Sequence, residues 1–302
     1  MIRFTEENGA LIAQSRNETI RIEGWGNNAL RVRTTLLKKL PQNAHALTEN
    51  VAHSAKVTIA EGSETAEIVN GKIKATINGV GIICFYKDNE LILQEYYSYY
   101  YGSIRKEAIC YKIRSREYKG LASDDFKITV RFESDPKEKL FGMGQYQMPI
   151  LDLKGSVLPL EQRNSQVSVP FVVSNKGYGM LWNNPSTGEA AFGTNITKWI
   201  SDEVDYWITA DDTPTQIVTN YTECVGRAPV MSKDYLGLWQ CKLRYRTPDE
   251  VLEVARKYKE LGIKLDVIVI DFFHWPHQGD WRFDEKYWSR DAVKAMTDEL
   301  HA

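Results

Sequence analysis

The hydrophobic period of this chain changes near Pro229, and the change limits the possible folds more than any other feature of the sequence. Before it, segments such as "ETIRIEG" and "ALRVRTT" alternate apolar and polar residues, which is the period of a half-buried strand. Asn-Gly pairs at 70–71 and 78–79 supply the positive φ that tight hairpins need. No stretch here has a helical period, and "TQIVTNYTE" (215–223) is predicted to be another strand. Residues 1–230 are therefore predicted to form a large antiparallel β-sandwich, which makes the chain mainly β.

The segment that follows combines strands with helices. "YLGLWQ" is predicted to be a short strand that ends at Trp239 and Gln240. "TPDEVLEVARKYKELGIK" predicts a helix with both ends marked. Thr247 can cap it, Glu250 completes a capping box, and Gly262 supplies a left-handed exit.

The second half of this segment repeats the pattern. "KLDVIVID" is a nearly continuous β-branched run, which is typical of a parallel strand buried on both faces. Another helix is expected to begin near Ser289 or Asp291. Two βα units can neither close a barrel nor cover a sheet, so residues 231–302 are predicted to be the incomplete start of a βα-repeat architecture, and the chain to be the N-terminal part of a longer protein.

Charge and composition exclude several classes of partner. The net charge is -2 and the two signs are interleaved, so the basic surface of a nucleic-acid-binding protein is absent. The apolar runs are too short to span a membrane, and the N-terminus is too polar for a signal peptide. The four cysteines form no CxxC motif, which favours buried free thiols in a reducing cytoplasm. They are Cys84, Cys110, Cys224 and Cys241.

Four motifs then suggest a family. "LGLWQCKLRYRTPDEVLEVARKYKELGIKLDVIVIDFFHW" resembles the start of the catalytic barrel in family 31 glycoside hydrolases, the α-glucosidase and α-xylosidase group. "LFGMGQYQ" (140–147), "GYGMLWNNPSTGEAAFG" (177–193) and "TECVGRAP" resemble further segments of that family in the same order. The resemblance covers the chain from about residue 20 onward, although Gln145 stands where many members have Glu.

The resemblance implies a fold and an activity. The fold would be a galactose-mutarotase-like sandwich followed by the first two βα units of a (β/α)8 barrel. The activity would be that of a retaining exo-hydrolase that releases terminal α-linked xylose or glucose from oligosaccharides, without a metal or organic cofactor.

In this family the nucleophile and the acid/base are aspartates on later barrel strands, so both are expected beyond residue 302 and the chain alone is expected to be inactive. A homo-oligomer is compatible with the sequence. The alternative is a non-catalytic carbohydrate-binding or assembly module.

The candidate substrate site begins at Asp271, which directly follows the second predicted barrel strand. Barrel enzymes build their sites at the carboxyl ends of the strands. A carboxylate there can accept hydrogen bonds from sugar hydroxyls, and aromatic rings can cover the apolar face of a sugar. The resemblance implies that Asp271 binds the sugar that is removed; the alternative is that it caps the next turn or pairs with a lysine. The other predicted substrate-binding residues are Trp239, Phe272, Phe273, His274, Trp275 and Asn184.

Several of these residues have a second interpretation. Phe272 and Phe273 suit core packing equally well, but a Phe-Phe pair after Asp271 could also crowd a hexose hydroxymethyl group and so favour xylose. His274 and His277 lack the further ligands of a metal site.

Other polar and aromatic residues of the same segments are not expected to act on the substrate. Asp280 and Asp284 are predicted to be solvated and do not form a catalytic pair with Asp271. The rings of Trp281, Phe283, Tyr287 and Trp288 are expected to pack the loop. In the sandwich, Asn183, Asn184 and Glu189 are predicted either to form a polar edge or to make an ordinary turn. Gly142 and Gly144 are expected to serve backbone geometry.

Overall fold

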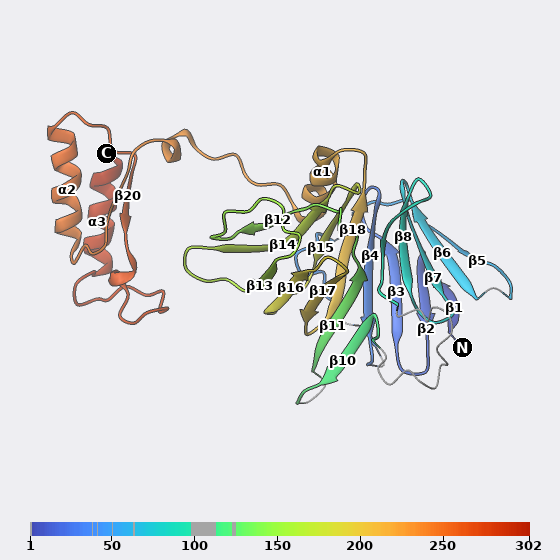
Figure 1. Ribbon diagram of the computed structural model, residues 1–302. Coiled ribbons are helices and arrows are strands. Elements are labelled where there is room, and N and C mark those ends of the chain that lie inside the picture. The colour runs from blue at the N-terminus through green and yellow to red at the C-terminus, as the bar shows by residue number, and fades with distance from the viewer. Residues whose placement is uncertain are drawn as a thin grey trace. The chain divides into compact units, whose positions relative to one another are not determined.

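The computed structural model describes residues 2–37, 39–40, 42–49, 51–62, 64–97, 113–122 and 125–302. The chain divides into two compact units, Met1–Arg227 and Ala228–Ala302. The regular structure of the first unit is mainly antiparallel sheet, and the second unit contains a parallel strand pair with helices (Figure 1). No helix among the described residues is both long enough and apolar enough to cross a membrane.

The largest sheet of the first unit has eight antiparallel strands, and its order brings β4 next to β18 although they are far apart in the sequence. Across the sheet the strands are β1 (Arg3–Glu7), β2 (Ala10–Gln14), β3 (Thr19–Gly24), β4 (Ala29–Thr35), β18 (Val204–Ala210), β15 (Tyr178–Trp182), β14 (Val167–Ser174) and β12 (Leu140–Gln145).

Two five-stranded antiparallel sheets complete this unit, and an isolated antiparallel bridge between Glu95 and Phe132 joins them. One contains β5 (Lys56–Ile59), β6 (Thr65–Asn70), β7 (Ile73–Asn78), β8 (Ile83–Lys87) and β9 (Glu90–Gln94). The other contains, in spatial order, β10 (Arg116–Gly120), β11 (Phe126–Glu133), β17 (Ile196–Ser201), β16 (Gly188–Phe192) and β13 (Val157–Leu160).

One hydrophobic core holds the three sheets together, because it contains buried side chains from all of them. Tyr206 of β18 receives the edges of two rings, Phe85 of β8 at 6.2 Å and Phe132 of β11 at 5.8 Å. Trp182 of β15 stacks on Trp199 of β17 with a centroid distance of 5.3 Å. The predicted antiparallel sandwich is therefore confirmed, with side chains that alternate between the core and the surface along its strands.

The structure contradicts the strand predicted for residues 215–223, which lie in the helix α1 (Pro214–Val225). Thr213 caps this helix by accepting a hydrogen bond from the Gln216 backbone, and Pro214 occupies its first turn. The segment is rich in β-branched residues, which lose side-chain freedom in a helix and resemble a strand by composition. Burial of Ile217 and Cys224 against the large sheet offsets that cost.

Gly142 and Gly144 serve backbone geometry, as predicted. Both have positive φ, and β12 changes register against β14 between them. A Cβ atom added to Gly144 would lie 2.2 Å from the carbonyl oxygen of Val167, so the close approach of the two strands requires glycine there.

The second unit contains the predicted strand–helix–strand–helix order: β19 (Trp239–Lys242), α2 (Pro248–Glu260), β20 (Val267–Ile270) and α3 (Arg290–His301). Short 3-10 helices, η2 (Lys233–Leu236) and η3 (Phe272–His274), precede β19 and follow β20.

The helix signals are confirmed, but the strand prediction is only partly right. Thr247 and Ser289 cap α2 and α3, and Gly262 has φ +67° after α2. Strand β20 is half-buried along its length and is not buried on both faces. Of its four residues, only Ile268 and Ile270 pack against the hydrophobic core of the second unit.

The three described cysteines are free thiols, although only Cys224 is buried. Cys84 is half-buried, and Cys241 in β19 is exposed, which contradicts its predicted burial. Cys110 lies outside the described residues.

Candidate functional site

The carboxyl ends of β19 and β20 lie at one edge of a parallel strand pair. Lys242 is opposite Ile270, and Asp271 follows immediately, so Asp271 stands where a barrel enzyme assembles its site. Trp239 does not. It begins β19 opposite Val267, three residues from this edge, and about 10 Å away at the usual rise of a strand.

The prediction that Trp239 ends the first strand is therefore wrong. The pairing with β20 sets the strand bounds, and it places the extended segment at 239–242. The Trp239 indole donates to the backbone oxygen of Tyr235 at 3.0 Å, which ties the ring to η2 at the opposite edge. We find no geometric support for Trp239 beside Asp271.

Asp271 caps the turn that follows it. Its Oδ1 accepts a hydrogen bond of 2.8 Å from the Phe272 backbone, and its carbonyl oxygen lies 2.8 Å from Nδ1 of His274. These contacts agree with the alternative that Asp271 caps the next turn, but capping uses only one of the two carboxylate oxygens. In the part of the chain that the structure describes, no group donates to Oδ2. A carboxylate has about four acceptor positions, so Oδ2 keeps its acceptor capacity while the backbone holds Oδ1.

A connected run of aromatic rings lies beside Asp271. Phe272 and Phe273 stack with centroids 4.3 Å apart, and Phe272 is 6.2 Å from Trp275. Trp275 is in turn 5.2 Å from Trp281, which is 86% exposed. Phe272 is also exposed, and Phe273 and Trp275 are half-buried. These rings therefore offer apolar surface to solvent, and Trp281 does not pack the loop as predicted.

His274 lies on the inner side of the loop. Its ring is 5.8 Å from Phe283 and 6.2 Å from Trp288, a residue that is 1% exposed. Its backbone oxygen accepts a hydrogen bond of 2.8 Å from the Asp284 backbone. His274 thus connects the turn after β20 to the start of α3, and Trp288 packs the loop as predicted.

Arg244 belongs to the same edge, although the sequence did not single it out. It is the second residue after β19, its side chain is exposed, and its guanidinium carbon lies 3.9 Å from the centroid of the Phe273 ring. A cation two residues beyond a strand end was the only available signal.

Two further acidic residues of the loop, Asp280 and Asp284, have partners of their own. A hydrogen-bonded ion pair with Arg282, 2.5 Å between the nearest atoms, lowers the pKa of Asp280 to about 2. Asp284 accepts a hydrogen bond from the Lys286 backbone at 3.2 Å. Both arrangements are turn stabilisation, so the described loop shows no acid and base facing each other.

Metal ligation is also unsupported in this loop. Among the described residues, one group has suitable spacing, His45, Glu203 and Asp205 in the sandwich. Both oxygens of Asp205 already accept hydrogen bonds from Arg31, at 3.0 and 2.6 Å. The Asp205 carboxylate is therefore engaged in an ion pair with Arg31 and is not free to bind a metal ion.

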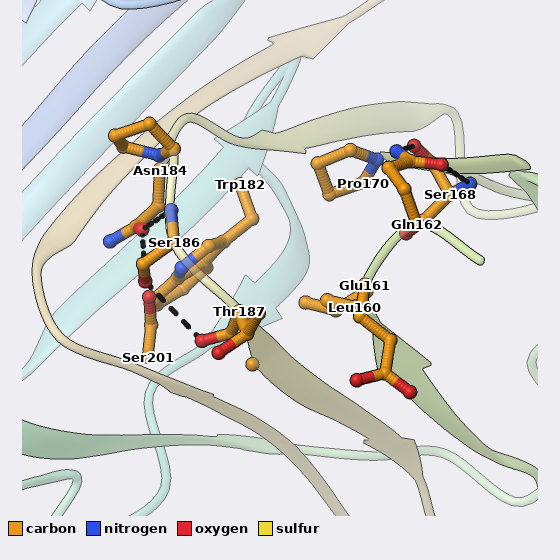
Figure 2. A pocket seen from close by; sticks show the side chains of 12 residues that line it. Leu160, Glu161, Gln162, Ser168, Pro170, Trp182, Asn184, Ser186, Thr187 and Ser201 are labelled. Carbon is orange, nitrogen blue, oxygen red and sulfur yellow. Dashed lines mark hydrogen bonds between the residues drawn. The ribbon is translucent and has the colours of Figure 1, made fainter. Parts of the chain in front are cut away.

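The sandwich has a hollow of about 300 Å³ next to the Asn183–Asn184 turn (Figure 2). Asn184 lines it, but its Oδ1 accepts hydrogen bonds from the backbone and the hydroxyl of Ser186, at 2.9 and 2.7 Å. Asn183 is 1% exposed and donates to Asp205, so it is no part of a polar surface edge. The alternative of an ordinary turn describes Asn184, whereas the buried Asn183 side chain bridges Ala44, Ala46 and Asp205. Glu189 is exposed on β16.

Comparisons with known proteins agree on one family. The model of the glycosyl hydrolase 31 N-terminal galactose mutarotase-like domain matches residues 19–190, and that of the glycosyl hydrolases family 31 TIM-barrel domain matches residues 228–302. An uncharacterized family 31 glucosidase, ORF2, of Pseudescherichia vulneris is 44% identical over 100% of this chain and 59% of its own length. An α-xylosidase of Saccharolobus solfataricus is 34% identical over 58% of this chain and 26% of its own length.

A solved structure of the same family is also similar to this chain. The GH31 α-xylosidase from a soil metagenome, complexed with xylose, superposes with a TM-score of 0.85 at 44% identity, over 99% of this chain and 45% of that one. This chain thus spans roughly half the length of the similar proteins that match all of it.

Proposed function

This chain belongs to glycoside hydrolase family 31, and from that premise we propose that the protein containing it is a retaining, exo-acting α-glycosidase. It removes terminal α-linked xylose or glucose from oligosaccharides. The observation that carries the proposal is Asp271, at the carboxyl end of β20, with one oxygen held by the backbone and the other without a donor among the described residues.

Asp271 binds the sugar that is removed. A carboxylate fixed by its own turn needs no reorganisation before it accepts hydroxyl hydrogen bonds, and such charge-assisted bonds are stronger than neutral ones. The exposed ring of Phe272 provides an apolar surface beside it. A carboxylate next to an aromatic ring matches the two surfaces of a pyranose, its hydroxyl edge and its C–H face.

The bond chemistry comes from other carboxylates. A retaining enzyme needs a nucleophile and an acid/base about 5–5.5 Å apart. Asp271 and Asp284 support turns, and Asp280 is paired with Arg282. In family 31 the nucleophile and the acid/base are aspartates on later barrel strands, so membership of the family implies that both are contributed by parts of the protein outside these 302 residues.

Xylose is the preferred sugar in this proposal. The stacked pair of Phe272 and Phe273 directly follows Asp271, and rings at this position would crowd the hydroxymethyl group of a hexose bound to Asp271. The expected preference is modest, since one such group changes binding in an apolar pocket by only about 1–3 kcal/mol.

A direct assay tests the function. The chain is expressed together with its native downstream sequence and assayed on aryl α-xyloside and aryl α-glucoside. We expect release of the sugar with retained anomeric configuration, measured by NMR early in the reaction. A folded protein that hydrolyses neither substrate would contradict the proposal, and inversion of configuration would contradict the mechanism.

A further inference from the structure

The segment after β19 is strongly basic. Lys242, Arg244 and Arg246 occur within five residues, "KLRYR". All three are exposed, and no ion pair joins any of them to a carboxylate within the described ranges of the second unit, where other cations such as Arg256 and Arg282 are paired. Unpaired cations at the edge where a site is assembled have a charge available for a ligand.

Arg244 has the most defined position of the three. Its guanidinium carbon is 3.9 Å from the centroid of the Phe273 ring, within the range of a cation–π contact. The ring contact restricts the side chain but uses none of its N–H groups, and the described residues supply no hydrogen-bond acceptor. The fork of five donors is therefore oriented and unoccupied.

Arg244 and Asp271 follow the carboxyl ends of two neighbouring strands, β19 and β20. Adjacent strands are about 4.8 Å apart, and Phe273 lies two residues after Asp271 and under the guanidinium. The edge thus carries an anion on the β20 side and an unpaired cation on the β19 side. A ligand that meets both would have hydroxyl groups near Asp271 and an anionic group near Arg244.

We infer that Arg244 is a specificity-determining residue that binds a carboxylate on the leaving-group side of the α-glycoside. The inference rests on the proposed function, in which Asp271 holds the sugar that is removed. A planar guanidinium matches a carboxylate with two parallel hydrogen bonds, whereas a hydroxyl uses the fork only in part. The substrate class is therefore an α-glycoside whose leaving group is an acidic sugar, such as a uronic acid.

Two matched disaccharides test this with the full-length protein. One carries terminal α-xylose on glucose and the other on glucuronic acid, through the same linkage. We expect wild-type kcat/KM to be about tenfold to a hundredfold higher for the acidic substrate, the effect of a hydrogen-bonded charge pair. This preference should decrease as salt concentration rises.

Variants identify the residue responsible. Arg244→Met should remove the preference mainly through KM of the acidic substrate, and Arg244→Lys should keep part of it. Lys259→Met is the matched control, because it removes the same charge from the exposed last turn of α2 and should keep the whole preference. The melting temperature of each variant is measured alongside.

Two results would overturn the inference. The first is an equal kcat/KM of the wild-type enzyme for both disaccharides. The second is a preference that survives Arg244→Met. Hydrolysis of neither disaccharide, nor of aryl glycosides, would instead refute the proposed function itself.

Discussion

The two units differ in how they use polar and apolar side chains. The sandwich buries ion pairs. Arg31 and Asp205 are 2% and 0% exposed, and Arg116 is buried against Glu95. The second unit buries a small core and leaves large apolar side chains in solvent, with Leu243 74% and Trp281 86% exposed. The sandwich pairs these buried charges with each other, whereas the second unit presents Asp271 Oδ2 and the Arg244 guanidinium without a polar partner among its described residues.

This difference separates stability from function. In the sandwich the buried Arg31–Asp205 and Arg116–Glu95 pairs satisfy each other's charge, so their polar groups are unavailable to a ligand. In the second unit Asp271 and Arg244 stand at a strand edge next to exposed rings, with acceptor and donor groups unoccupied in the described structure. Exposed apolar surface combined with unpaired polar groups is typical of binding surfaces. Five experiments can challenge this contrast.

The largest effect concerns activity. We expect the 302 residues alone to show no glycosidase activity, because loss of the nucleophile and the acid/base together costs roughly a millionfold in kcat. Release of nitrophenol from aryl α-xyloside and α-glucoside is the measurement, with a catalyst-free preparation as the control. Turnover above that control would show that the second unit already contains a complete site.

Hydrogen exchange compares the stability of the two units directly. We expect amides of β4 and β18 to exchange on the order of a hundredfold more slowly than those of β19 and β20 in a dilute monomer, because local opening requires less energy where few apolar groups are buried. Mass spectrometry of peptic peptides would give both rates in one sample. Equal strong protection of both strand pairs would contradict the comparison.

Ion pairs should also differ in strength between the units. Burial raises the pKa of the Asp205 carboxyl and Arg31 opposes that effect, so Arg31→Met leaves an uncompensated buried acid. We expect a loss of about 3–5 kcal/mol in the free energy of unfolding. The control is Arg256→Met, which removes a solvent-exposed pair with Glu299 and should cost far less than Arg31→Met. Chemical denaturation measures both, and similar losses would show that burial does not distinguish the pairs.

Much of this contrast could be predicted from the sequence, but only where the signals are local. Thr247 and Gly262 mark both ends of α2 within one segment. The same Thr-Pro signal at Thr213 was overlooked, because β-branched residues after it imitate a strand. Packing against the large sheet decides that case, and packing is not visible in the sequence.

In the candidate site, too, only features set by local sequence could be predicted. Asp271 was predictable because a carboxylate directly follows a β-branched run. Trp239 was misplaced because pairing with a distant strand sets the bounds of β19. Arg244 was missed because its contact with Phe273 joins two loops that are close only in the folded chain.

Asp271 is the sharpest single test of the second unit. In the full-length protein, Asp271→Asn should reduce kcat/KM about tenfold to a hundredfold, since it removes a charge-assisted hydrogen bond of about 1.5–3 kcal/mol. Asparagine can still accept the hydrogen bond from Phe272 and cap the turn, so the melting temperature should stay the same. Asp280→Asn is the control and should cost much less. Unfolding of the Asp271 variant would show that capping is its whole role.

The smallest expected effect concerns Asp280, which tests whether the outer loop is as solvated as its exposure implies. The hydrogen bond from Arg282 lowers the pKa of Asp280 to about 2. A lowered carboxyl pKa stabilises the fold above the ordinary value of about 3.9, and the benefit is lost as the pH falls toward 2. Carboxyl NMR should therefore give a pKa near 2 in the wild type and a value near 3.9 in Arg282→Met. Because the pair is exposed, neither kcat/KM nor the melting temperature at neutral pH should change appreciably.

An unchanged Asp280 pKa in the variant would mean that Arg282 is not its partner in solution. A large loss of activity would mean that this part of the loop contacts the substrate and is not merely solvated.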